Sequence, residues 1–187
     1  GRAMTRRSFL SLSAAAAAQT RRSNPPNVIL ILSDDQGYGD LSLHGNPHLS
    51  TPHLDRIAKE GVQFTQFQVC PVCSPTRASL MTGRYHYRTG IVDTFKGRSL
   101  MDPREQTAAE LFAAAGYRTG IFGKWHLGDA PEFMPLRRGF DEYFGLSLSA
   151  DYWPGHPDLI TNFPTQLAAK KREYPNLPIW DGTNIFH

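Results

Sequence analysis

The sequence predicts an α/β fold in which a mainly parallel sheet is flanked by helices. An uninterrupted apolar run at residues 27–32 is typical of a parallel strand that is buried on both faces. Further β-rich segments alternate with segments that carry helix start and stop signals, which favours strand–helix–strand units. The chain has 187 residues, of which 40% are hydrophobic and 20% charged, so it is long enough to bury one core.

The first helix is expected between Thr51 and Gly61. Thr51 can cap it, the proline at position 52 suits its first turn, and the glycine can end it. Its apolar residues share one face and are Leu54, Ile57 and Ala58. Residues 62–69 are rich in β-formers, and we expect them to form a second strand.

A second helix is expected after Ser74-Pro75, which repeats the pattern of a capping residue followed by proline. This helix would run through Ala78 and stop at Gly83. Cys73 would then lie just before the helix start. The position matters because a cysteine near a helix N-terminus acquires thiolate character more readily than an ordinary one.

The third helix begins with a capping box, Thr-Ala-Ala-Glu, at residues 107–110. We expect it to end at Gly116 and to turn two large side chains inward, Leu111 and Phe112. A strand is predicted over residues 117–122. From Asp129 the sequence is rich in proline, glycine and aromatic residues without periodicity, and we interpret it as loops of a larger protein.

The positive charge of the chain is concentrated at its beginning. Residues 1–22 contain five arginines and no acidic residue, and without them 15 basic residues stand against 17 acidic ones. The body of the protein is therefore not basic, which argues against a nucleic-acid partner. The same segment combines paired arginines with a short apolar, alanine-rich stretch, typical of an export signal of the twin-arginine type. It is too short to span a bilayer.

These features predict an export signal over residues 1–22 and a linker over residues 23–26, followed by a folded region at residues 27–187. An exported protein of this kind would use the export machinery as a partner and would reach the periplasm or the extracellular space. We expect no stable membrane span.

Two adjacent carboxylates, Asp34 and Asp35, directly follow the first predicted strand. In open α/β sheets the carboxyl ends of strands form the ligand crevice. A hard divalent cation such as calcium or magnesium would offset the repulsion between the two carboxylates. A solvated turn would explain the pair equally well.

Cys70 and Cys73 form a C-x-x-C pair and are the two cysteines of the chain. A zinc site would need two more soft ligands nearby, and the sequence contains no second C-x-x-C. A redox-active dithiol of the thioredoxin type remains a competing interpretation.

The residues that follow Cys73 resemble the signature of the formylglycine-dependent sulfatases, within the alkaline phosphatase-like superfamily. The core of that signature is C-x-P-x-R, and here it reads Cys-Ser-Pro-Thr-Arg over residues 73–77. Four segments match the family in order and spacing, and the resemblance as a whole covers roughly residues 27–145. The segments are residues 34–40, 73–84, 123–128 and 138–145.

The resemblance implies that Cys73 is converted to formylglycine, whose hydrate is a gem-diol. One hydroxyl of the diol would attack the sulfur of a sulfate ester, and the other would expel sulfate and regenerate the aldehyde. Arg77 would orient the diol, Lys124 would contact sulfate oxygens, and His126 would bond to the diol. Lys124 and His126 lie two apart, so both could face one side of an extended segment.

The resemblance also implies a calcium ion, with magnesium as the alternative, held by Asp34, Asp35 and the modified Cys73. Its charge would polarise the sulfate oxygens. The family's later metal ligands, a further histidine and a second lysine are not found in this sequence. We therefore expect these 187 residues to be the N-terminal part of a sulfatase catalytic domain, inactive alone.

The expected function of the whole protein is hydrolysis of sulfuric esters, in the manner of an arylsulfatase. Its partners would be a sulfated small molecule or glycan and a formylglycine-generating enzyme. A phosphonate or phosphate monoester hydrolase of the same superfamily is the nearest alternative. An exported C-x-x-C dithiol oxidoreductase and a non-catalytic module with unmodified Cys73 are the others.

Overall fold

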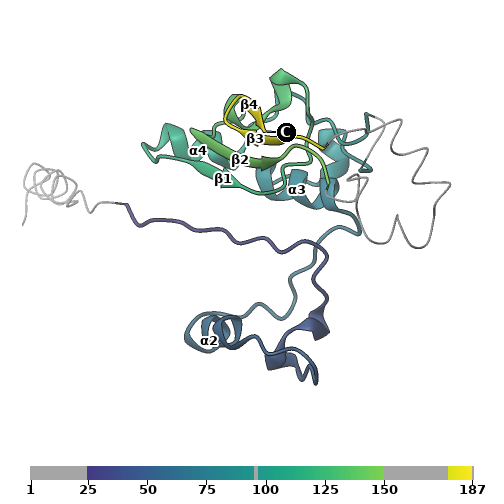
Figure 1. The fold of residues 1–187 in the computed structure, drawn as a ribbon, viewed down its shortest axis with the longest axis vertical. Coiled ribbons are helices and arrows are strands. Elements are labelled where there is room, and N and C mark those ends of the chain that lie inside the picture. Colours follow the sequence, from purple (N-terminus) through teal and green to yellow (C-terminus); the bar gives the residue numbers. More distant parts are fainter. Residues whose placement is uncertain (1–24, 95–96, 150–176, 187) are drawn as a thin grey trace, which may run out of the picture. The chain divides into compact units, whose positions relative to one another are not determined.

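The computed structural model describes residues 25–94, 97–149 and 177–186 (Figure 1). The chain divides into two units, residues 1–36 and residues 37–187, and each is considered by itself. The predicted export signal and the first half of the predicted linker lie outside the described residues. In the part of the chain that is described, no helix combines the length and apolar character needed to cross a membrane.

The second unit contains a four-stranded sheet in the order β1-β2-β3-β4. The strands are β1 (Gly120–Phe122), β2 (Glu142–Leu146), β3 (Ile179–Asp181) and β4 (Asn184–Phe186). β1 and β2 are parallel, whereas the β2–β3 and β3–β4 pairs are antiparallel. The α/β class is confirmed, since helices accompany this sheet, but its described part is mixed rather than mainly parallel.

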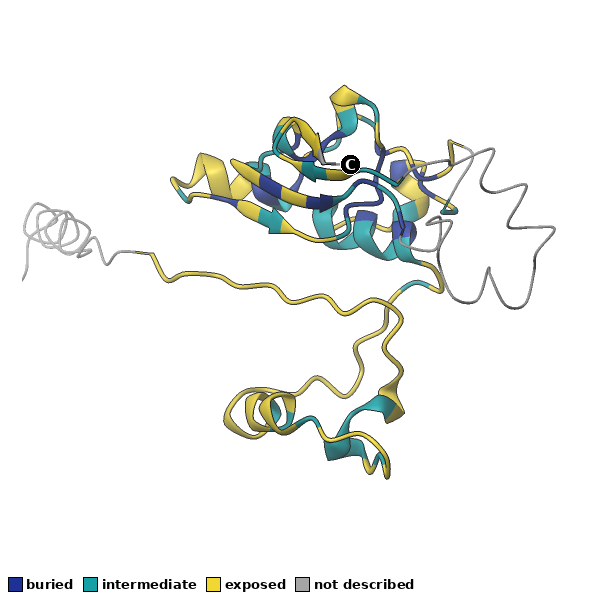
Figure 2. Cartoon of the chain, in the orientation of Figure 1, coloured by how far each residue is buried: buried dark blue, intermediate teal, exposed yellow. Residues whose placement is uncertain are grey.

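The predicted strand over residues 27–32 is wrong for the described structure, in which these residues form no regular element. Their apolar side chains are exposed, with Ile29 at 84% (Figure 2). A strand is stable only where a neighbour satisfies its backbone groups, and no described strand pairs with this run. Residues 62–69 fail to form a strand for the same reason.

The predicted first helix is confirmed as α2 (Pro52–Glu60), with Thr51 at its N-cap and Gly61 at its C-cap. The Thr51 hydroxyl donates to a carboxylate oxygen of Asp55 at 2.9 Å instead of capping a backbone N–H. The hydroxyl of Ser42 donates to the same carboxylate at 2.7 Å. These hydrogen bonds hold the preceding loop on the first turn of α2 and lower the pKa of Asp55, chiefly through Ser42.

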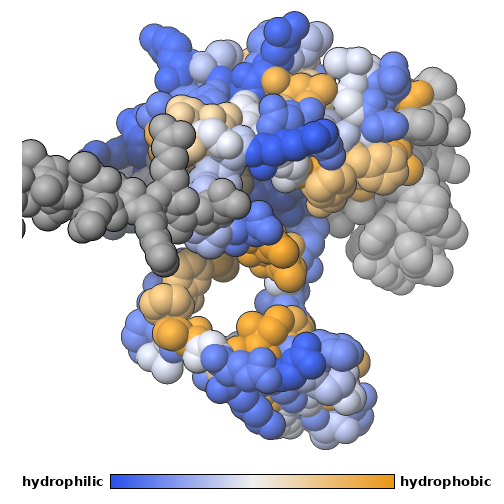
Figure 3. Space-filling model, turned by 90° about the vertical axis from the view of Figure 1, so that its left-hand side faces the viewer, coloured by the Kyte–Doolittle hydropathy of each residue, from blue (hydrophilic) through white to orange (hydrophobic). Residues whose placement is uncertain are grey.

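Exposed hydrophobic side chains are numerous on this structure and form separate patches in Figure 3. The apolar face of α2 belongs to this exposed surface, because Leu54 and Ile57 are both exposed. An amphipathic helix normally buries such a face against another element. The sequence pattern of α2 is therefore that of a packed helix, although no described residue covers its apolar face.

The second predicted helix is α3 (Cys73–Thr82), closed by Gly83 in the left-handed conformation. The N-cap lies two residues earlier than predicted, at Val72 instead of Ser74, so Cys73 is the first residue of the helix. The Ser74 hydroxyl caps no backbone group. Ser74 and Pro75 are instead buried inside the first turn.

The third predicted helix is α4 (Ala108–Ala114), and its capping box on Thr107 and Glu110 is confirmed. The inward orientation of two of its side chains is wrong, since Leu111 is 55% exposed and Phe112 37%. The buried residue is Ala109, in the first turn. The reason is that Gly139 approaches this turn so closely that an added Cβ would lie 2.3 Å from the Glu110 nitrogen.

We had expected the region after Asp129 to consist of loops. This expectation is wrong, because the region contributes β2, β3 and β4. The predicted strand over residues 117–122 is confirmed in its last half as β1. Asp141 stabilises the start of β1 by accepting hydrogen bonds from the backbone and side chain of Thr119. These bonds hold the pKa of Asp141 below its ordinary value.

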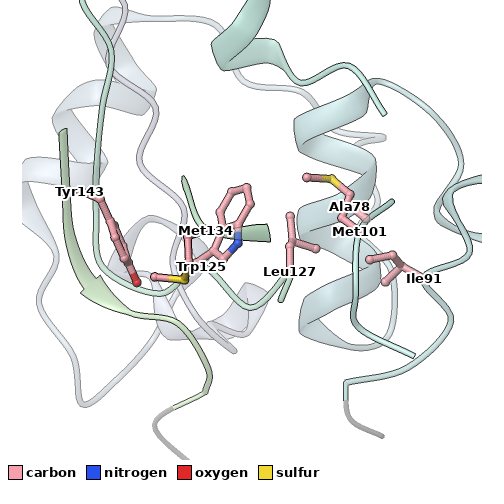
Figure 4. Packing of buried hydrophobic residues seen from close by; sticks show 7 residues of the cluster. All are labelled: Ala78, Ile91, Met101, Trp125, Leu127, Met134 and Tyr143. Atoms are coloured by element: carbon pink, nitrogen blue, oxygen red, sulfur yellow. The ribbon is translucent and has the colours of Figure 1, made fainter. Parts of the chain in front are cut away.

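The core of the second unit is a cluster of apolar side chains, shown in Figure 4. Its buried members are Ala78, Ile91, Met101, Trp125, Leu127, Met134 and Tyr143. Trp125 also donates from its ring nitrogen to the carbonyl of Phe133 at 2.9 Å. Burial of a leucine-sized side chain contributes about 1.5–3 kcal/mol. The core therefore holds the short segment after β1, which contains both Trp125 and Leu127, firmly in place.

The same segment is held to β2 by backbone hydrogen bonds that continue beyond the end of β1. Gly123 donates to Phe144 at 2.8 Å and accepts from Leu146 at 3.1 Å. An added Cβ on Gly145 would lie only 1.9 Å from the carbonyl oxygen of Gly123. Only glycine at position 145 permits this approach of the two chains.

Replacing this glycine should therefore destabilise the fold. We expect Gly145→Ala to lower the free energy of unfolding by about 2–4 kcal/mol, because the two backbones must separate. Gly39→Ala is the control, since an added Cβ there meets nothing within 4 Å, and its effect should stay within about 0.5 kcal/mol. Urea denaturation measures both, and equal effects would contradict the close approach.

Candidate active site

The predicted catalytic residues of the second unit come from two segments that the fold brings together. Cys73 and Arg77 lie in the first turns of α3, and Lys124 and His126 lie just after β1. The second segment is fixed by hydrogen bonds from Trp125 to Leu146 at 2.8 Å and from His126 to Ser147 at 3.0 Å.

The expectation that Lys124 and His126 lie on an extended segment is wrong at His126. Its φ angle is 59°, in the left-handed region that non-glycine residues seldom adopt. Trp125 and Leu127 enter the core on either side of it. The unusual backbone conformation is thus maintained by burial of both neighbours, as is typical of strained residues at functional sites.

Cys73 and His126 are in direct contact. The Cys73 Sγ lies 3.2 Å from the Nδ1 atom of His126, and the Nε2 atom on the opposite side of the ring lies 2.9 Å from the carbonyl oxygen of Thr94. A carbonyl oxygen can only accept, so Nε2 carries a proton. In the neutral ring Nδ1 is then the acceptor, and it faces the side chain of residue 73.

Arg77 ties the two segments together a second time. Its guanidinium donates to the backbone carbonyl of Lys124. Arg77 and Lys124 are both half-buried, so two positive charges lie on the segments that carry Cys73 and His126. Such an arrangement suits an anionic group bound near residue 73.

Cys70 has other neighbours than Cys73. Its Sγ lies 3.9 Å from the Ser79 hydroxyl, and its carbonyl accepts from the Thr76 hydroxyl at 3.1 Å. Both cysteines are free thiols. The two sulfurs therefore contact different groups, and only that of Cys73 has a proton acceptor beside it among the contacts described.

Asp34 and Asp35 belong to the first unit, where they form an exposed bend directly after the apolar run. Asp35 has a φ angle of 56°, again in the left-handed region. The expectation that Asp34, Asp35 and residue 73 bind one calcium ion stays a prediction. Among the described residues no three histidine, cysteine or acidic side chains form a metal-binding group. Two neighbouring carboxylates nonetheless fit part of a calcium site, because calcium binds several oxygen ligands.

One contact of the candidate site escaped the sequence analysis, namely the one between His126 and the backbone carbonyl of Thr94. No side-chain motif could have signalled it, since every residue has a carbonyl and only the folded chain brings this one to His126. Ser74 was expected only as a cap, but its hydroxyl is completely buried, with no partner among the described residues.

Known proteins resemble this chain over most of its length. Residues 26–176 match the family model described as Sulfatase. N-acetylgalactosamine-6-sulfatase of Sus scrofa is 46% identical over 148 residues, covering 73% of this chain and 28% of the relative. Arylsulfatase A of Homo sapiens is 45% identical over 150 residues, covering 77% of this chain and 30% of the relative. The chain thus spans less than a third of these relatives.

Solved structures give the same result. The crystal structure of Ps i-CgsB has a TM-score of 0.68 and 33% identity, covering 86% of this chain and 37% of that chain. The PsFucS1 sulfatase from Pseudoalteromonas sp. also has a TM-score of 0.68, with 28% identity, covering 96% of this chain and 38% of that chain.

The contact of Arg77 with the Lys124 carbonyl predicts a measurable stability difference. Arg77→Ala should lower the free energy of unfolding by about 1.5–3 kcal/mol, the range for hydrogen bonds to charged groups. Arg104→Ala is the control, because the Arg104 side chain is 90% exposed in its pair with Asp102, and it should cost less than about 1 kcal/mol. Both are compared by urea denaturation with Cys73 unconverted. Equal losses would show that the contact of Arg77 with the Lys124 carbonyl does not stabilise the fold more than an exposed ion pair does.

Proposed function

This chain belongs to the sulfatase family, and from that premise we propose that the protein containing it hydrolyses sulfate esters. The observation that carries the proposal is the contact between Cys73 Sγ and His126 Nδ1 at 3.2 Å. It places a proton acceptor at the residue that begins the C-x-P-x-R signature.

We propose further that Cys73 is converted to formylglycine, which when hydrated supplies a hydroxyl nucleophile and a second hydroxyl for the release of sulfate. His126 can take a proton at Nδ1 from the group on residue 73, while its Nε2–H stays bonded to the Thr94 carbonyl. That carbonyl bond also stabilises the ring while it is protonated.

The two cationic side chains have separate roles in this proposal. Arg77 holds the segment of His126 against α3 through the Lys124 carbonyl. Its charge and that of Lys124 would offset the negative charge of a sulfate group near residue 73. Charge stabilisation of this kind is effective where side chains are partly withdrawn from water, as both of these are.

Calcium is the proposed metal, with magnesium as the alternative, and Asp34, Asp35 and residue 73 are its proposed ligands in this chain. When bound, the ion would polarise the sulfate oxygens. The support is the oxygen chemistry of the two carboxylates and the strained backbone at Asp35.

Substrate class follows from the relatives only in outline. The relatives' names include an N-acetylgalactosamine-6-sulfatase and an arylsulfatase A. We therefore propose a sulfated glycan or an aryl sulfate as substrate. A phosphonate or phosphate monoester is the second candidate, since the cationic pair and a hydrated aldehyde would suit a phosphoryl group as well.

The location and partners are also proposals. The paired arginines and apolar stretch in residues 1–22 support export to the periplasm or beyond. A formylglycine-generating enzyme is the partner that the conversion of Cys73 requires.

The direct test is mass spectrometry of the peptide that spans Cys70 to Arg77, after expression with a formylglycine-generating enzyme. Conversion of a thiol to an aldehyde exchanges sulfur for oxygen and removes two hydrogens, so Cys73 alone should show the corresponding loss in mass. In the full-length protein, Cys73→Ala should abolish hydrolysis of an aryl sulfate. Cys70→Ser should retain most of it, because the contacts of Cys70 are with Ser79 and Thr76. Two unmodified thiols in an active protein, or equal loss in the two variants, would refute the proposal in favour of a dithiol.

The metal assignment is tested separately. In the full-length protein, Asp34→Ala with Asp35→Ala should remove bound calcium and reduce turnover by at least about 100-fold, since metal ligands are lost. Conversion of Cys73 should be unaffected. Asp40→Ala is the control, because the Asp40 carboxylate accepts from the Gly37 backbone at 2.7 Å. Metal analysis and mass spectrometry give both readouts, and calcium retained by the double variant would make the pair a simple turn.

A further inference from the structure

The carbonyl of Thr94 reaches His126 from a turn whose ends are both tied. On the N-terminal side, Ile91 is fully buried in the core and its carbonyl lies 2.7 Å from Nδ1 of His86. On the C-terminal side, the carbonyl of Arg98 accepts from the backbone of Val92 at 3.1 Å. Thr94 therefore lies between two tied positions, Ile91 and Arg98.

Asp93 is the side chain that links these two sides at Thr94. One carboxylate oxygen accepts from the backbone N–H of Thr94 at 2.8 Å, and the other lies 3.5 Å from the guanidinium of Arg98. The bond to Thr94 orients the peptide group that precedes Thr94. The Thr94 carbonyl belongs to the next peptide group, so Asp93 acts on it through the backbone of Thr94.

We propose that Asp93 is a positioning residue for the reaction at residue 73. It holds the Thr94 carbonyl against His126 Nε2, and this leaves Nδ1 of the ring as the acceptor facing residue 73. The role in turnover rests on the proposed function, but the effect on the side chain of residue 73 does not. Groups that orient a functional histidine through its second nitrogen are commonly carbonyls or carboxylates.

The alternative is that Asp93 only stabilises a surface turn. Its ion pair with Arg98 is long and exposed, so the pair itself contributes little to stability. The bond to the Thr94 N–H is shorter and does not need a charge. Asparagine can accept this bond with its amide oxygen, whereas alanine cannot. The two substitutions therefore separate positioning from charge.

The experiment compares Asp93→Ala and Asp93→Asn in the full-length protein, with an aryl sulfate as substrate. We expect Asp93→Ala to lower kcat by roughly 10- to 100-fold, the usual cost of losing a group that orients a functional histidine. KM and the melting temperature should change little, because the substrate contacts and the core are intact. Asp93→Asn should restore kcat to within about threefold of the parent, because it keeps the bond to Thr94.

Asp102→Ala is the matched control. Asp102 likewise accepts from a nearby backbone N–H, that of Arg104 at 2.9 Å, and pairs with the Arg104 guanidinium. No described contact joins its side chain to His126. The kcat of this variant should equal that of the parent. An equal loss in Asp102→Ala, or a loss in Asp93→Ala that only follows a lower melting temperature, would overturn the positioning role.

A second readout does not depend on sulfatase activity. In unconverted protein, Nδ1 of a correctly held His126 accepts a hydrogen bond from the Cys73 thiol, which makes the sulfur more nucleophilic. Asp93→Ala should slow alkylation of Cys73 by iodoacetamide at least about fivefold, with Cys70 in the same peptide as internal reference. An unchanged ratio of the two alkylation rates would overturn the inference. If the parent hydrolyses no sulfate ester, the proposed function is refuted. The ratio of the two alkylation rates then still tests whether Asp93 positions His126.

Discussion

The candidate site depends on the burial of the two neighbours of His126, which fixes the backbone at this residue. Trp125 and Leu127 both enter the core, and the backbone of the segment is hydrogen-bonded to residues 146 and 147. A side chain between two buried residues of an extended strand would point away from the core. The left-handed φ angle of His126 changes this, so its ring is itself buried, with 1% exposure, and meets Cys73.

Backbone packing also brings the two segments of the site close enough for the Arg77 side chain to join them. The parallel pairing of β1 with β2 brings Gly123 to Gly145 at a distance that excludes any side chain at position 145. The chain then passes directly to the segment that faces α3. Arg77 and Cys73 meet that segment from one face of the helix, since residues four apart on a helix lie on the same side. The geometry thus follows from backbone packing, and rigid packing is what a catalytic arrangement requires.

Local signals in the sequence predicted the helices well and the strands poorly. Thr51 with Pro52, and Thr107 with Glu110, mark helix starts through interactions within a few residues, and both starts are present. The run at residues 27–32 would need a partner strand to become a strand, and the described residues offer none. The strands after Asp129 were missed because they carry no periodicity of their own, and β2 moreover pairs with residues that are distant in sequence.

The candidate site shows the same division between local and distant information. The signature from Cys73 to Arg77 is local, so sequence alone could single out the residue proposed for modification. The groups that act on it are not local: His126 is 53 residues away along the chain, and its own partner at Thr94 is a further 32 residues back. A motif can thus mark the proposed nucleophile, but only the fold brings the ring of His126 to it. Cys70 illustrates the point, because it lies three residues from Cys73 in sequence and yet its sulfur contacts Ser79 instead of a base. Closeness along the chain made the two cysteines look like a dithiol, whereas their sulfurs contact different groups, which supports the different roles that we propose for them.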